Sequence, residues 1–151
     1  MTWTTLLVPH DFSSSANHAL ALARDEAKLH GAKIVLLHVI DIPHQMGLDA
    51  VVFPPDTKAP ISVRDYAMNS AQAHLDDLIA RLARDHATVT ALVRVGAPLE
   101  EILRAADELP ASAIIMGTHG RGGVRHLLAG SVAERVVRSA KVPVLTVRHP
   151  D

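Results

Sequence analysis

Short apolar runs alternate with amphipathic runs along this chain of 151 residues. Five of the runs are rich in aliphatic and β-branched side chains, as is typical of strands buried on both faces of a parallel sheet. These runs cover residues 4–9, 33–40, 88–95, 112–116 and 142–147. Strands that alternate with helices predict an α/β fold, in which a mostly parallel sheet carries helices on both faces through right-handed crossovers.

Between these runs, except over residues 41–61, apolar residues recur at the spacing of a helix. The first predicted helix ends at Gly31, and three candidate residues offer hydroxyls to cap its start: Ser13, Ser14 and Ser15. Its apolar stripe is Ala16, Leu20, Ala23 and Ala27. The other helices are predicted over residues 62–86, from Pro98 onward and over residues 131–140. Charged pairs on these helices, such as Glu100-Glu101, are expected to face solvent.

Residues 41–61 contain no such pattern. Three prolines and a glycine, together with Pro43, break any regular element in this segment. A gap of this length inside a compact domain is typical of a functional or mobile loop. The chain has no internal repeat and no second pattern of elements, so residues 1–151 are predicted to form a single doubly wound, Rossmann-like domain.

A glycine-rich frame follows the fourth predicted strand. Gly117-Thr118-His119-Gly120 is separated by nine residues from Gly130-Ser131, at the start of the last predicted helix. Main-chain N–H groups around glycines, together with a helix N-terminus, suit the binding of phosphate. The groups expected to contribute are the N–H groups of Gly117, Gly120, Gly122, Gly123 and Gly130, the hydroxyl of Ser131 and the charge of Arg121 or Arg125. Two plainer interpretations stay open: such glycines also permit turns, and Ser131 also suits a helix cap.

Two further groups lie at the carboxyl ends of predicted strands, where doubly wound folds bind ligands. Asp11 follows the first strand and suits a ribose hydroxyl or a place near a cation held by phosphates, although it also suits a turn before the helix. The main chain of Val39, at the end of the second strand, suits the edge of a base. His10 and His119 are near enough to contact a ligand but are more typical of polar loop residues.

The composition excludes several functions. The net charge of −1 gives no indication of nucleic-acid or anionic-membrane binding. The chain has no cysteine, which excludes disulfides and thiolate metal sites, and its 10 histidines lack metal-ligand spacing. Neither a signal peptide nor a membrane-spanning run is visible, so we expect a cytoplasmic protein.

The pairing of Pro9-x-Asp11 with the Gly117, Gly120, Gly130 and Ser131 frame resembles the ATP-binding subgroup of the universal stress protein family, over essentially the whole chain. The resemblance implies a five-stranded parallel sheet of order 3-2-1-4-5. It implies ATP, or ADP or AMP, in the crevice, with Mg²⁺ or Mn²⁺ bound through the phosphates and no metal ligand from the chain. It also implies a homodimer through the C-terminal strand, residues 142–148. The residues expected at the crevice are Pro9, His10, Asp11, Val39, Met116, Gly117, His119, Gly120, Arg121, Gly122, Gly123, Gly130, Ser131 and Val132.

The sequence therefore predicts a stress-response or regulatory protein that couples adenine-nucleotide binding to its conformation or its partners. The alternative is a slow ATPase or phosphotransfer enzyme. The chain lacks the Gly-x-x-x-x-Gly-Lys-Ser/Thr loop, and no residue stands out as a base for water, so catalysis is the weaker hypothesis. A dinucleotide dehydrogenase would place its glycines after the first strand, where Pro9-His10-Asp11 stands instead.

Overall fold

The computed structural model describes residues 1–43, 47, 49–57, 59–82, 88–118 and 131–148. Its main sheet has five parallel strands in the order β5-β2-β1-β6-β7. They are β1 (Thr5–Pro9), β2 (Lys33–Ile40), β5 (Val89–Val95), β6 (Ala113–Gly117) and β7 (Val144–Val147). Numbered among themselves, these strands have the order 3-2-1-4-5, so the α/β fold expected from the sequence is confirmed.

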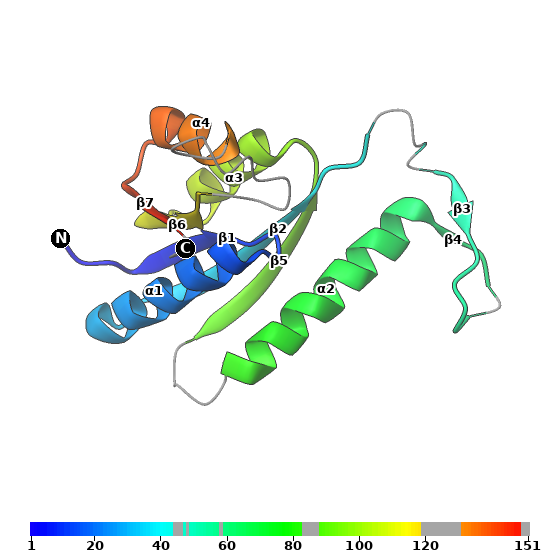
Figure 1. Ribbon diagram of the computed structural model, residues 1–151, viewed down its shortest axis with the longest axis horizontal. Helices are drawn as coiled ribbons and strands as arrows, with labels where there is room; N and C mark the ends of the chain where they lie inside the picture. Colours follow the sequence, from blue (N-terminus) through cyan, green and yellow to red (C-terminus); the bar gives the residue numbers. More distant parts are fainter. Residues whose placement is uncertain (44–46, 48, 58, 83–87, 119–130, 149–151) are drawn as a thin grey trace.

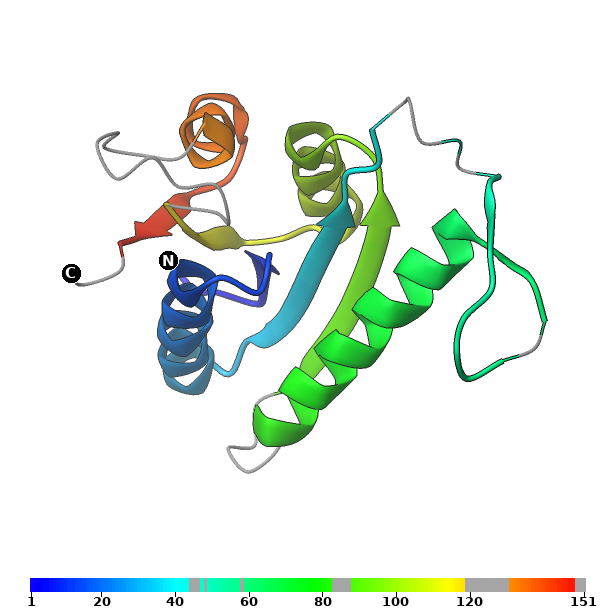
Figure 2. The same ribbon diagram turned by 45° about the vertical axis from the view of Figure 1, so that its right-hand side comes forward.

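Helices cover both faces of this sheet (Figure 1; Figure 2). They are α1 (Ser14–His30), α2 (Val63–Leu82), α3 (Pro98–Glu108) and α4 (Ser131–Ser139). α1 and α2 cover one face, and α3 and α4 cover the other. Within the part of the chain that the structure describes, no helix has the length and apolar character needed to cross a membrane.

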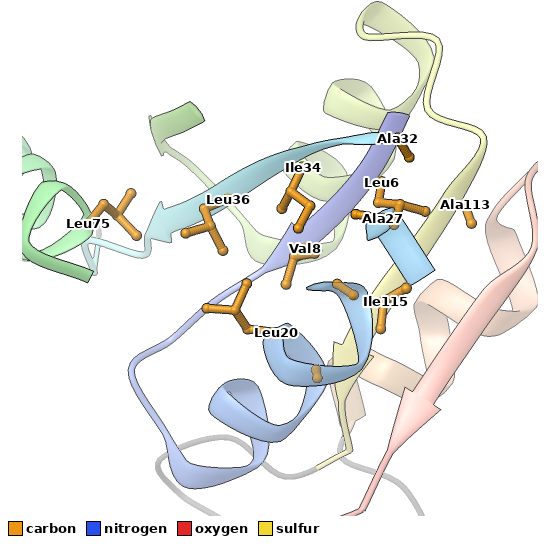
Figure 3. Close-up of a cluster of buried hydrophobic side chains, with 12 residues drawn as sticks. Leu6, Val8, Leu20, Ala27, Ala32, Ile34, Leu36, Leu75, Ala113 and Ile115 are labelled. Carbon is orange, nitrogen blue, oxygen red and sulfur yellow. The ribbon is translucent and has the colours of Figure 1, made fainter. Parts of the chain in front are cut away.

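The core consists of two apolar layers, one on each face of the sheet. Alternate residues of β1 supply both layers: Leu6 and Val8 face α1, whereas Leu7 faces α3. Figure 3 shows the first layer, with Leu20 of α1 and Leu75 of α2 beside the strands. Runs of apolar residues were expected for strands covered on both faces, and the structure confirms this interpretation.

The first helix has the predicted ends. The Ser13 side chain accepts a hydrogen bond from the N–H of Ala16 at 3.2 Å. Gly31 closes the helix in the left-handed region with φ 67°, a conformation that costs glycine little. The predicted apolar stripe of this helix is buried throughout: Ala16, Leu20, Ala23 and Ala27.

One prediction about the segments between the strands needs correction, and another is tested only in part. Residues 41–61 were expected to hold no regular element, but β3 (Val51–Val52) and β4 (Ile61–Ser62) form a small antiparallel sheet. Figure 1 shows it beside the start of α2, away from the main sheet. The second helix was predicted over residues 62–86; α2 ends at Leu82, and residues 83–87 lie outside the described part.

Candidate functional site

β1 ends earlier than the strands on either side of it. It pairs with β2 as far as Pro9, opposite Leu37, and the N–H of His10 adds one bond of 2.8 Å to the Leu37 carbonyl. β2 continues to Ile40, and β6 continues past Ile114, its last partner in β1, to Gly117. We call the place in the sheet that a longer β1 would occupy the β1 end position.

The main chain of Val39 faces the β1 end position. Residues of a parallel strand bond alternately to the neighbours on its two sides. The Ile40 carbonyl accepts from the Gly96 N–H at 3.0 Å, on the β5 side of β2. Val39 precedes Ile40, so its N–H and carbonyl point to the opposite side, toward β1. One donor and one acceptor are thus directed to the place where β1 has ended.

The main chain of Gly117 faces the same place from the other side. The Thr118 N–H donates to the Val147 carbonyl at 3.0 Å, on the β7 side of β6. By the same alternation, the N–H and carbonyl of Gly117 point toward β1. Neighbouring strands lie about 4.8 Å apart, so β2 and β6 flank the β1 end position across roughly 10 Å. This is also the topological switch point, because the chain leaves β1 toward β2 and returns to β6 on the other side.

Close packing against α1 explains why residue 117 is glycine. A Cβ atom at Gly117 would lie 2.7 Å from the carbonyl carbon and 2.9 Å from the Cβ of Ser15. The Ser15 side chain is buried and donates to the Val147 carbonyl at 3.2 Å, which ties α1 to β7 as well. Gly117 was expected to follow its strand and serve an anion. It is the last residue of β6, and its lack of a side chain allows the start of α1 to approach the sheet. Its expected role toward an anion stays a prediction.

Asp11 lies in the turn that connects β1 to α1. One carboxylate oxygen accepts from the N–H of Ser13 at 3.0 Å, as expected for a turn residue ahead of a helix. The residue is half-buried, and one of its oxygens is used in this bond. The turn interpretation is therefore correct, and it leaves the carboxylate at the carboxyl end of β1.

His10 is buried, contrary to the expectation of a polar loop residue. Only 3% of its surface is exposed. One ring nitrogen, Nε2, lies 3.1 Å from Oδ1 of Asn17, and the other, Nδ1, accepts from the N–H of Phe12 at 3.1 Å. Burial lowers the pKa of His10, against smaller opposing effects of the Asn17 hydrogen bond and the Asp11 charge.

Phe12 adopts a backbone conformation that side chains rarely take. Its φ of 64° lies in the left-handed region, which costs a non-glycine residue about 1–2 kcal/mol. Three imidazole rings surround its ring, with centroid distances of 5.4 Å to His10, 4.7 Å to His38 and 5.5 Å to His74. The hydrogen bond from its N–H to His10 and these ring contacts hold the strained turn in place.

A cluster of charged side chains lies at the end of β5 and on α3. Glu101 is buried, with Oε1 2.7 Å from Arg104 and Oε2 3.6 Å from Arg94. Arg94 also binds Glu108, and this bond is the main cause of its raised pKa. The side chain of Glu101 packs over Gly96, where a Cβ would lie 2.9 Å from its Cγ. The expectation that Glu101 faces solvent is wrong, because its side chain is buried between α3 and the end of β5.

The structure brings together three of the predicted groups: the turn at residues 9–11, Val39 and Gly117. Met116 has its side chain buried in the layer beneath α3 and α4, and Val132 packs against that layer. α4 begins at Ser131, as predicted. The remaining predicted residues lie outside the described part of the chain: His119, Gly120, Arg121, Gly122, Gly123 and Gly130.

Three residues of the site were missed as such from the sequence. Phe12 and His38 were not singled out, and Ser15 was named only as a possible cap. His38 could have been identified, because it lies near the carboxyl end of a predicted strand. Nothing in the sequence indicates the left-handed conformation of Phe12.

The β1 end position offers main-chain donors and acceptors together with one carboxylate. A base edge needs a donor and an acceptor side by side, which the main chain of a strand residue such as Val39 offers. Ribose hydroxyls need an acceptor, which the Asp11 carboxylate offers. Among the described residues, no group of three or more His, Asp or Glu side chains is arranged to hold a metal ion.

Comparisons with known proteins agree with this architecture. Residues 2–148 match the model of the universal stress protein family. A universal stress protein of Thermus aquaticus is 34% identical over 145 residues, covering 95% of this chain and 98% of the relative.

Two solved structures extend the comparison. The structure of protein MJ0577, from Methanocaldococcus jannaschii, superposes with a TM-score of 0.84 at 28% identity, covering 100% of this chain and 99% of the other. A universal stress protein from Archaeoglobus fulgidus superposes with a TM-score of 0.67 at 23% identity, covering 97% of this chain and 99% of the other. The latter likeness establishes a shared fold.

Proposed function

The chain belongs to the universal stress protein family, and we propose that it binds an adenine nucleotide at the β1 end position. In this proposal the base bonds to the main chain of Val39, and Asp11 accepts from a ribose hydroxyl. The phosphates extend past Gly117 toward the glycine frame and the start of α4. Binding then biases the conformation of the protein or its choice of partner, as expected of a regulatory protein.

The observation that carries this proposal is the direction of two main chains. Val39 and Gly117 belong to different strands, yet both direct their N–H and carbonyl groups to the place where β1 has ended. A strand could occupy this place, but the chain has turned into α1. A planar ligand with polar edges satisfies such groups, as ligands do at the switch points of doubly wound folds.

Relatives support the choice of an adenine nucleotide. The Archaeoglobus fulgidus protein was solved in complex with dAMP, and a further universal stress protein was solved in complex with cAMP. ATP, ADP and AMP share the adenine base of these ligands. A divalent cation, Mg²⁺ or Mn²⁺, accompanies ATP in the proposal and is held by its phosphates. The cytoplasm is the expected compartment, since it supplies such nucleotides.

We also propose a homodimer through the C-terminal strand. β7 ends the described sheet, and its residues alternate in direction: the Pro143 and Val147 carbonyls accept bonds from β6. Thr146 therefore directs its N–H and carbonyl outward, where a second β7 can pair with them.

The test is a calorimetric titration of the nucleotide-stripped protein with ATP and Mg²⁺. We expect saturation near one nucleotide per chain. Asp11→Asn keeps an oxygen for the Ser13 N–H but replaces the other carboxylate oxygen with a donor. Loss of one hydrogen bond to a charged acceptor should weaken binding by about 1.5–3 kcal/mol, roughly 10- to 100-fold.

Two further variants complete the design. Asp107→Asn is the matched control, because this aspartate pairs with Lys141 on the surface of α3. Gly130→Val should abolish binding by blocking the approach of phosphate to the main chain. Absence of binding to ATP, ADP and AMP would refute the proposal, and equal affinity in Asp11→Asn and wild type would refute the assignment of Asp11.

A further inference from the structure

His10 joins three segments of the site. Its ring contacts Asn17 of α1 and the N–H of Phe12, and its carbonyl accepts from Nδ1 of His38 on β2 at 2.7 Å. Its own N–H extends the ladder between β1 and β2. Hydrogen bonds of His10 thus connect the turn that contains Asp11 to the sheet and to α1.

The two ring contacts define the protonation state of His10. A main-chain N–H can only donate, so Nδ1 must carry a lone pair to accept from Phe12. The proton of the neutral ring is then on Nε2, which donates to Oδ1 of Asn17. Protonation of Nδ1 would set two N–H groups against each other and remove the bond to Phe12.

We propose that His10 is a positioning residue of the nucleotide site, which holds the β1–α1 turn in its binding conformation only while its imidazole ring is neutral. The inference rests on the proposed function, since it concerns how protons regulate that same site. The turn is sensitive to this bond because Phe12 has φ 64°. Without the bond, the residue relaxes toward the β or right-handed region and moves Asp11, its neighbour in the chain.

The charged and titratable groups around His10 set the balance between its two forms. Asp11 in the same turn favours the charged ring, whereas His38 on β2 disfavours it. Asn17 on α1 bonds to the ring without carrying a charge. His74 on α2 reaches the cluster through the ring of Phe12. Burial is the largest effect and lowers the pKa of His10, so the ring is neutral at and above neutral pH.

The expected consequence is nucleotide affinity that falls with acidity. If the nucleotide binds only the neutral form, the Kd rises by about tenfold per pH unit once the pH is below the pKa of His10 in the free protein. Above that pKa the Kd is constant. The nucleotide's own phosphates titrate too, so the informative quantity is the ratio of variant to wild-type Kd at each pH.

Three variants isolate the effect of His10. His10→Asn places an oxygen at the position of Nδ1, so it accepts from Phe12 without titrating in this range. Asn17→Asp adds a carboxylate beside Nε2, which favours the charged ring and shifts the loss of affinity to higher pH. His30→Asn is the matched control, because His30 lies at the opposite end of α1 beside Trp3.

The experiment combines two measurements between about pH 8 and about pH 5.5. Nitrogen-15 NMR of the nucleotide-free protein reports the tautomer and titration of His10 and the amide of Phe12. Calorimetry with ATP and Mg²⁺ reports the Kd of wild type and the three variants. Unfolding is monitored at each pH by circular dichroism, because the control His30→Asn changes the surroundings of Trp3.

The proposal expects the proton on Nε2, a Phe12 amide that shifts together with the His10 titration, and a pH-dependent Kd that His10→Asn flattens. A neutral ring protonated at Nδ1, or a Phe12 amide indifferent to the titration, would overturn it without reference to any ligand. Parallel pH profiles in wild type and His10→Asn would also overturn it. Absence of ATP binding at about pH 8 in a protein with the expected NMR titration would refute the proposed function, and the regulation with it.

Discussion

Gly117 can be required for close packing against α1 or for the approach of a phosphate group. The substitution Gly117→Ala, measured without nucleotide, tests the packing requirement alone. The added Cβ would lie 2.7 Å from the carbonyl carbon and 2.9 Å from the Cβ of Ser15, and closer still to its hydroxyl oxygen. Two of these three atoms belong to the backbone or its first side-chain carbon, which cannot rotate away. Either α1 moves off the sheet or the end of β6 shifts.

Overpacking of this kind costs about 1–3 kcal/mol. For a chain of this length, each kcal/mol lowers the Tm by about 2–4 °C. The assay is urea unfolding followed by the fluorescence of Trp3, whose Nε1 donates to Glu26 of α1 at 3.1 Å. Measurement without nucleotide ensures that the effect arises from packing and not from a lost ligand.

Two controls frame the result. Gly31→Ala adds a Cβ that meets nothing within 4 Å, so its cost of about 1 kcal/mol comes from φ 67° alone, and Gly31→Asn should recover part of it. Ser15→Ala removes the hydroxyl nearest to the added Cβ and also its hydrogen bond to the Val147 carbonyl. Gly117→Ala should therefore cost less in a Ser15→Ala background than in wild type. A Gly117→Ala protein as stable as wild type would refute the packing explanation.

Three further predictions concern other parts of the molecule. Glu101→Gln should lower stability by about 1–3 kcal/mol in urea unfolding, because Arg94 and Arg104 lose a charged partner; unchanged stability would contradict the role given to this cluster. Thr146→Pro should convert the proposed dimer to monomer in light scattering by removing an outward N–H, whereas Thr146→Val should not; a dimeric proline variant would argue against pairing through β7. Stability should be highest above about pH 6.5 and fall below it until the folded-state pKa of His10 is reached, since that pKa is lowered and the unfolded chain binds the proton more readily. His10→Asn should flatten this fall in thermal unfolding, and an equal fall in both proteins would exclude His10 as its source.

The sequence predicted the main sheet well because its signals were local and strong. A strand or helix that packs against a buried layer must place apolar residues at the spacing of that element, so its pattern is visible in the sequence. The small sheet of β3 and β4 escaped prediction because strands of two residues have no periodicity to detect. The prolines around them indicated a loop correctly but gave no sign of the pairing within it.

The candidate site was predicted in part, and its errors have a common cause. Residues at strand ends were identified from topology, and the structure places Asp11, Val39 and Gly117 at the same edge of the sheet. The burial of His10 and Glu101 could not be predicted, because it depends on side chains distant in the sequence. The reason for Gly117 was likewise hidden, since Ser15 lies about a hundred residues earlier in the chain.

The central claim is that a nucleotide bonds to main chains facing the β1 end position, and amide hydrogen exchange measured by NMR tests it most directly. Saturating ATP should slow exchange at Val39 and Gly117. Ile40 and Thr118, whose main chains bond to β5 and β7, should exchange at the same rate with and without ATP. The predicted result is slower exchange at Val39 and Gly117 and unchanged exchange at Ile40 and Thr118. Saturable binding that leaves Val39 and Gly117 unchanged would contradict the account.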